Sequence, residues 1–160
     1  MKIKFVLNGE TVTINKNPSE KLSVFLKEKK LIGSKEGCSD YSYSSCTVLI
    51  NGTAVPACLT SLAQCDNTEI ITLDEFRKTE DYADIKKGFE QAFVRMCGYC
   101  NSGKVFMANK IISTNPRPSR DEIRKQVSFF DCKCTELDAL VDGVYYAAAS
   151  RRSRREKKQK

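Results

Sequence analysis

Cysteine is the residue type in this chain with the clearest chemical potential, and four cysteines of the second half form two tight pairs. The pairs lie about thirty residues apart and read Cys97-Gly98-Tyr99-Cys100 and Cys132-Lys133-Cys134. Thiolates bind zinc and iron–sulfur clusters, and Gly98 would let the backbone approach a metal closely. The spacing therefore predicts one four-thiolate metal site built from two turns.

Packing, zinc binding and dithiol chemistry each account for less of this pattern. Free cysteines can pack as small apolar residues, but two tight pairs rarely arise that way. A zinc ribbon usually has two C-x2-C knuckles, whereas the second pair here is C-x-C. A thioredoxin-like dithiol would use Cys97 and Cys100 and leave Cys132 and Cys134 without a role.

A second cysteine series lies in the first half, at Cys38, Cys46 and Cys58, with a gap where a fourth ligand is expected. The chain contains no histidine. That absence excludes Ser–His and Cys–His catalytic pairs, mixed Cys/His zinc sites and Rieske-type ligation. Any metal must therefore be held by thiolates, supplemented at most by an oxygen ligand.

The N-terminus and the cysteine content together indicate the compartment. The apolar run of residues 3–7 ends at Asn8-Gly9-Glu10, too early for a signal peptide, and no stretch approaches a membrane span in length. We therefore expect a cytoplasmic protein without a membrane partner. In that reducing setting, clustered cysteines bind metal more often than they form disulfides.

The net charge of +7 is concentrated in the last ten residues. Arg151–Lys160 carries seven basic residues and one acidic residue, so the other 150 residues are close to neutral. The body shows no basic face, and we expect no nucleic-acid partner. We interpret the tail first as a disordered, solvated end. Docking onto an acidic partner comes second and nucleic-acid binding third.

The elements that position the first cysteine series are predicted to form a small mixed sheet. Alternating residues 2–7 and 10–14 flank Asn8-Gly9, the dipeptide of a type I′ hairpin turn, and Asn51-Gly52 joins a second hairpin of residues 47–50 and 53–57. Leu22, Phe25 and Leu26 share one face of a short helix, capped near Ser19 and followed by Gly33. A helical turn over 58–64 and a strand over 69–73 complete this half.

The second half is predicted to be helical from about Tyr82 onward, after a linker over 76–81. Ile85, Phe89 and Phe93 recur at a spacing of four and point one helix face toward a core. Further helices are expected over 104–112, after a capping box at Ser119–Glu122, and over 135–149. The fold class is therefore α+β.

At these residues the chain resembles the iron–sulfur subunits of the xanthine dehydrogenase family of molybdenum hydroxylases. The motifs that carry the resemblance are specific and cover nearly the whole chain apart from the tail: Cys97-Gly98-Tyr99-Cys100, Asn115-Pro116-Arg117-Pro118-Ser119, Cys132-Lys133-Cys134-Thr135, Gly33-Ser34-Lys35-Glu36-Gly37-Cys38, Cys46-Thr47-Val48-Leu49-Ile50-Asn51-Gly52 and Ala57-Cys58-Leu59-Thr60.

The resemblance implies a β-grasp domain like plant-type ferredoxin over residues 1–75, a four-helix [2Fe–2S] domain over 82–150 and a basic tail over 151–160. It implies that Cys97, Cys100, Cys132 and Cys134 hold the helical-domain cluster beside a molybdopterin centre in a large partner subunit. The ferredoxin-type cluster would pass electrons on to flavin, usually in a further partner.

The first cysteine series departs from the family's Cys-x4-Cys-x2-Cys pattern. Tyr43 stands where the second cysteine is expected, and the segment from Cys38 to Cys46 contains no glycine to bring backbone amides to the sulfurs. Three outcomes are open: the cluster is absent, it survives with an oxygen ligand from Tyr43 or a serine, or Cys65 replaces the missing ligand. We favour absence, because several supporting residues changed together.

Met96 occupies the position where the family commonly has a glutamine that contacts the pterin, and its thioether cannot donate that hydrogen bond. Met96 and Gly98 are thus the two candidate cofactor-contacting positions. The chain carries no arrangement of general base, nucleophile or phosphate loop. The first hypothesis is an electron-transfer subunit with one [2Fe–2S] cluster. The alternative is a scaffold or zinc-binding subunit that keeps the fold without electron transfer.

Overall fold

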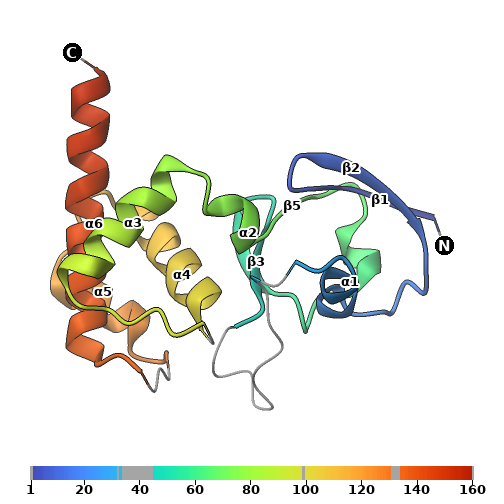
Figure 1. Ribbon diagram of the computed structural model, residues 1–160, viewed down its shortest axis with the longest axis horizontal. Coiled ribbons are helices and arrows are strands. Elements are labelled where there is room, and N and C mark those ends of the chain that lie inside the picture. The colour runs from blue at the N-terminus through green and yellow to red at the C-terminus, as the bar shows by residue number, and fades with distance from the viewer. Residues whose placement is uncertain (1, 32, 34–44, 99, 131–133, 160) are drawn as a thin grey trace. The chain divides into compact units, whose positions relative to one another are not determined.

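The computed structural model describes residues 2–31, 33, 45–98, 100–130 and 134–159 (Figure 1). Two compact units are present. The sheet unit comprises Met1–Arg77 with Tyr99–Phe106, and the helical unit comprises Lys78–Gly98 with Met107–Lys160. Cys38, Tyr43 and Cys132 lie outside the described residues.

The sheet unit is built on five strands in the order β2-β1-β5-β3-β4. Antiparallel pairs join β1 (Lys2–Leu7) to β2 (Glu10–Asn15), and β3 (Thr47–Ile50) to β4 (Thr53–Pro56); β5 (Glu69–Ile71) runs parallel to β1 and antiparallel to β3. Both hairpin turns place an asparagine and a glycine at positive φ, as type I′ turns require. The two predicted hairpins are confirmed.

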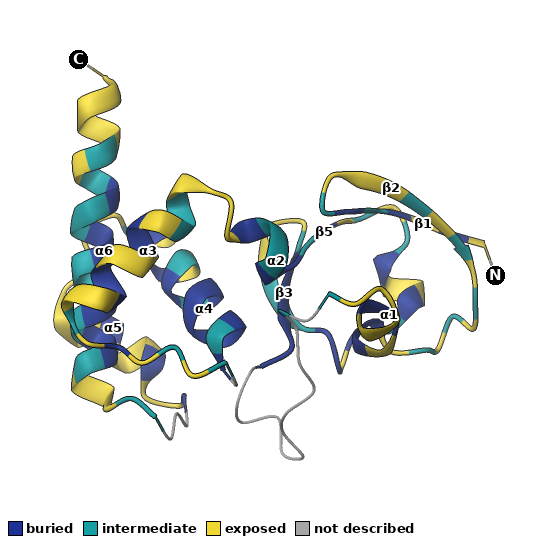
Figure 2. Cartoon of the chain, viewed as in Figure 1, coloured by how far each residue is buried: buried dark blue, intermediate teal, exposed yellow. Residues whose placement is uncertain are grey.

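The core of the sheet unit lies between the sheet and α1 (Leu22–Glu28). Ile3, Phe5 and Leu7 alternate into this core from β1, and the Phe5 and Phe25 rings meet edge to face with centroids 5.7 Å apart. In Figure 2 the buried residues of β1 and α1 face each other, whereas β2 is largely exposed. This packing is apolar, so the fold of the unit has a driving force that does not depend on metal.

The ends of α1 differ from the prediction. Lys21, not Ser19, occupies the N-cap position, and the helix ends well before Gly33. Lys30 has a φ of 58°, and the Leu31 N–H donates to the Leu26 carbonyl at 3.0 Å. This is a Schellman motif in which a lysine takes the left-handed position that glycine usually fills.

Shorter elements follow the second hairpin. A 3-10 helix, η1 (Leu62–Cys65), begins at a capping box between Ser61 and Gln64. The last strand ends at Ile71, two residues earlier than predicted, because Leu73 already begins α2 (Leu73–Phe76). The Asn8 side chain binds Thr72 through both its amide and its carbonyl group, which secures this turn to the first hairpin.

The helical unit contains α3 (Glu80–Gln91), α5 (Arg120–Val127), α6 (Leu137–Lys158) and most of α4 (Asn101–Thr114). The helix α3 packs closely on α6, since a Cβ added at Gly88 would lie 2.2 Å from the Ala147 backbone nitrogen. The capping box of Ser119 and Glu122 forms as predicted. The helix predicted from Tyr82 begins two residues earlier, where Thr79 caps it by accepting from the Tyr82 N–H.

Phe93 corrects the predicted core face of α3. The helix ends at Gln91, and Phe93 takes a φ of 58° with 90% of its surface exposed. The Val94 N–H then donates to the Phe89 carbonyl at 2.8 Å, and Val94 is buried in its place. The spacing of four failed because the Schellman turn moved the next apolar side chain one position along.

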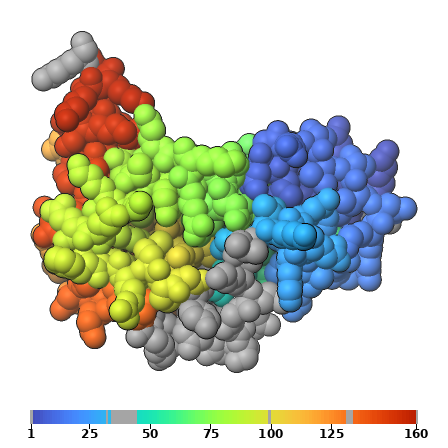
Figure 3. Space-filling view, viewed as in Figure 1, coloured from blue at the N-terminus to red at the C-terminus, as the bar shows by residue number. Residues whose placement is uncertain are grey.

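The basic tail is a second correction. Residues 151–158 are not disordered but continue α6, and their last turns extend beyond the rest of the helical unit in the space-filling view (Figure 3). Arg154 forms ion pairs with Glu80, Asp81 and Asp84 of α3, and Arg151 is buried. Acidic residues of α3 therefore attract the tail and keep it helical. Among the described residues, no helix is long and apolar enough to cross a bilayer.

Candidate metal centre

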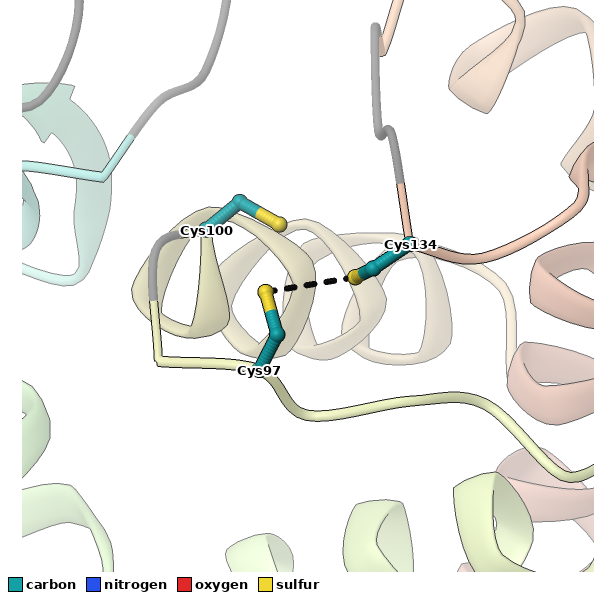
Figure 4. A group of neighbouring side chains, drawn as sticks. All are labelled: Cys97, Cys100 and Cys134. Atoms are coloured by element: carbon teal, nitrogen blue, oxygen red, sulfur yellow. Dashed lines mark hydrogen bonds between the residues drawn. The ribbon is translucent and has the colours of Figure 1, made fainter.

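Three cysteines of the second series converge. The Sγ atoms of Cys97, Cys100 and Cys134 all lie within 4.8 Å of one another, and those of Cys97 and Cys134 are 3.2 Å apart. Figure 4 shows the three side chains turned toward a common point from separate segments. Among the described residues this is the one group of at least three metal-ligating side chains at such distances. The predicted convergence of the two turns is therefore observed for these three sulfurs.

Helix termini position these thiols. Cys100 immediately precedes α4, and its carbonyl accepts the Lys104 N–H at 3.0 Å, so it occupies the start of the first turn. Cys134 stands three residues before the start of α6. The N-terminus of a helix carries partial positive charge, which favours the anionic thiolates that a metal requires.

The three thiols differ in exposure. Cys100 is 3% exposed, Cys134 is half-buried and Cys97 is exposed. Neither a carboxylate nor an imidazole belongs to the group. An all-sulfur donor set of this kind suits an iron–sulfur cluster or zinc and does not suit the hard cations that prefer oxygen.

The two candidate cofactor-contacting residues flank Cys97. Gly98 has a φ of 92°, a conformation that L side chains rarely adopt, so a glycine is needed at this turn. Met96 is half-buried. Whether either residue contacts a cofactor stays a prediction.

Sequence reasoning overlooked Thr135, which follows Cys134. Its hydroxyl accepts the Arg95 N–H at 3.1 Å and donates to the Arg95 carbonyl at 3.2 Å. These two bonds join the segment before Cys97 to the segment after Cys134. The threonine stands directly after the cysteines in the motif Cys132-Lys133-Cys134-Thr135, and its position was the only available signal.

The first cysteine series is only partly assembled within the described residues. The Sγ atoms of Cys46 and Cys58 lie 3.2 Å apart in the core of the sheet unit. No third metal-ligating side chain of the described ranges joins them at the distances found around Cys97. Two thiols of the predicted first site are thus brought together without a third from this part of the chain.

Cys65 does not replace the missing ligand. It is fully buried at the end of η1, and its thiol donates to the Ser61 carbonyl at 3.5 Å. Burial raises the pKa of the Cys65 thiol to about 11, so near neutral pH it stays protonated, whereas a metal ligand must be a thiolate. Its chemical character is that of a core residue.

The start of α4 is also tied to the sheet unit's first cysteine series. The buried Ser102 hydroxyl donates to the Ser45 carbonyl at 2.7 Å, next to Cys46. A serine at this position therefore serves a backbone contact within the sheet unit, an arrangement that the sequence did not reveal.

Known proteins with this sequence pattern are iron–sulfur proteins. Residues 72–145 match the family described as "[2Fe-2S] binding domain". The small FeS subunit of nicotinate dehydrogenase from Eubacterium barkeri is 34% identical over 91% of this chain and 93% of that protein. The xanthine dehydrogenase iron-sulfur-binding subunit of Escherichia coli O157:H7 is 30% identical over 89% of this chain and 91% of that protein.

Solved structures agree with these relatives. Quinoline 2-oxidoreductase from Pseudomonas putida 86 contains a chain that superposes with a TM-score of 0.81 at 32% identity, over 95% of this chain and 96% of that chain. The aldehyde oxidoreductase of Desulfovibrio gigas superposes with a TM-score of 0.83 at 27% identity, over 96% of this chain but 17% of that chain.

This chain belongs to the family of [2Fe–2S] iron–sulfur subunits of molybdenum hydroxylases. The predicted α+β fold, with a ferredoxin-like sheet unit and four helices after it, is confirmed. The [2Fe–2S] cofactor is confirmed for the family, and the zinc and scaffold alternatives are not favoured.

Proposed function

We propose that this protein transfers electrons within a molybdenum hydroxylase-type complex through one [2Fe–2S] cluster held by Cys97, Cys100, Cys132 and Cys134. The convergence of three of these thiols within 4.8 Å carries the proposal. Cys132 lies outside the described residues and is assigned as the fourth ligand from the cysteine motif. When bound, such a cluster takes up one electron and releases it again.

The residues of the site divide its tasks. Buried Cys100 and half-buried Cys134 hold the inner side, where the N-terminus of α4 favours negative charge. Exposed Cys97 marks the side open to solvent, and a redox partner would approach there. Gly98 keeps the backbone beside Cys97 free of a side chain.

The electron donor is proposed to be a molybdopterin-binding large subunit. This chain matches 17% of the aldehyde oxidoreductase chain of Desulfovibrio gigas, so an equivalent of the remainder would be supplied here by a partner chain. A flavin-binding subunit is the family's usual acceptor. With Tyr43 in place of one cysteine, we propose that the first site holds no cluster and that electrons leave for a different acceptor.

A reducing compartment is consistent with this function. The six cysteines that the structure describes are all in the thiol form, and a cytoplasmic setting would keep them so. We therefore place the complex in the cytoplasm.

Metal analysis of the native complex tests the proposal. We expect about two iron and about two acid-labile sulfide per chain, with visible absorption, and molybdenum in a co-purifying subunit. Colourless protein with one zinc, or with no metal, would overturn electron transfer as the function. About four iron per chain would retain electron transfer but overturn the one-cluster assignment.

A further inference from the structure

The two segments that present Cys97 and Cys134 come from distant parts of the helical unit. Cys97 ends the segment that follows α3, whereas Cys134 stands before α6, and 37 positions separate them in the sequence. Their sulfurs nevertheless lie 3.2 Å apart. Loops do not hold such a distance by themselves, so contacts beside the cysteines must set it.

The segment before Cys97 is anchored at its first part by packing. Val94 is buried against α6, since a Cβ added at Gly143 would come within 2.7 Å of the Val94 Cγ2 atom. The Val94 N–H also donates to the Phe89 carbonyl at the end of α3. Arg95 comes next in the chain, and a single residue separates it from Cys97.

Thr135 holds the same segment at Arg95. One hydroxyl satisfies both polar backbone groups of a residue forty positions away, accepting from its N–H and donating to its carbonyl. Thr135 is half-buried, so these bonds are partly shielded from water. Because Thr135 directly follows Cys134, the bonds define the spacing between the two ligand segments.

The hydroxyl also lies near sulfur. The Cys134 Sγ atom is 3.8 Å from the Thr135 Oγ1 atom and 3.7 Å from the Arg95 carbonyl oxygen. Hydrogen bonds to ligating sulfurs raise the reduction potential of a cluster, and contacts around a metal site also affect how firmly it is held.

We propose that Thr135 is a positioning residue that holds the Cys97 and Cys134 segments together through the Arg95 backbone. The inference extends the proposed function, because it assumes that these cysteines bind the cluster. The hydroxyl is the essential group, and the methyl group of the threonine contributes volume only.

Three variants of the full chain, purified with its partners, separate these contributions. Thr135→Val keeps the shape and removes the hydroxyl, Thr135→Ser keeps the hydroxyl, and Thr114→Val removes the hydroxyl of an exposed threonine elsewhere in the unit. The first readout is hydrogen exchange at the Arg95 amide. We expect exchange about ten times faster in Thr135→Val, and wild-type exchange in the other two variants.

The second readout is the cluster. In Thr135→Val we expect iron loss to a chelator to be about 10 to 100 times faster, with a shifted electron paramagnetic resonance spectrum of the reduced cluster. Thr135→Ser should restore both. Wild-type exchange and wild-type iron retention in Thr135→Val would overturn the inference, as would a serine variant that fails like valine.

The two proposals fail in different ways. If the wild-type complex contains no iron, the proposed function is wrong, and the Arg95 exchange still reports whether Thr135 joins the two segments. If the wild-type complex contains iron and Thr135→Val behaves as wild type in both readouts, only the positioning role is wrong.

Discussion

The two cysteine series differ in how completely the described residues assemble them. Around Cys97, three thiols converge at helix ends, and one of them is exposed. In the sheet unit, Cys46 and Cys58 meet within an apolar core, without a third described ligand at comparable distances. The first arrangement is built to present a metal to the surface, and the second is built to be buried.

This difference shows how a subunit can lose one metal site and keep its fold. The core of the sheet unit is formed by β1, α1 and their neighbours, whose aliphatic and aromatic side chains supply the stabilising burial. Cys46, Cys58 and Cys65 belong to that core, and a cysteine thiol packs as a small apolar group. A metal is therefore not required to keep these strands together, unlike in a zinc finger.

The largest expected effect comes from removing one thiol from each site. We expect Cys97→Ser to reduce iron from about two per chain to almost none, because a thiolate is lost from the occupied site. Cys46→Ser, the matched control, should leave the iron content unchanged. Metal analysis of the two purified variants measures both. Iron loss in Cys46→Ser would contradict the contrast, since it would place the cluster in the sheet unit.

A second change addresses why the first site is incomplete. Tyr43→Cys restores the missing thiol, at a position outside the described residues. We expect iron to stay at about two per chain, because the segment also lacks the glycines that bring backbone amides to the sulfurs. A rise toward about four iron would show instead that the ligand alone was missing. Iron and acid-labile sulfide analysis distinguishes these outcomes.

Local sequence signals predicted much of this fold. The Asn-Gly hairpins and the Ser119 capping box depend on a few neighbouring residues, and both form as expected. The cysteine spacing predicted a shared metal site, and three of its four thiols are seen together. Each of these features is determined by short-range chemistry, which a single sequence displays directly.

Features that depend on distant contacts were missed or misjudged. Lys30 and Phe93 end helices in left-handed conformations that favour glycine, so their residue types gave no warning. The Thr135 bonds to Arg95 join residues forty positions apart. The tail was judged by its charge alone, whereas the acidic residues that order it belong to α3.

The smallest expected effect concerns that tail and separates the two units by stability. Arg151 is 2% exposed and donates to Asn109 Oδ1 at 3.0 Å and to the Asp81 carbonyl at 3.3 Å, which links α6 to α4 and α3. Arg151→Met keeps an unbranched side chain but leaves both acceptors without this donor. We expect a loss of about 2 kcal/mol, because hydrogen bonds from a charged donor contribute that much.

Hydrogen exchange reads this effect in each unit separately. In Arg151→Met, amides of α3 and α6 should exchange faster, whereas those of β1 should be unchanged, because Arg151 packs within the helical unit. Arg155→Met is the matched control, since Arg155 is exposed on the same helix. Equal acceleration in β1 would show that the units unfold together, and the metal-free sheet unit would then depend on the helical unit for its stability.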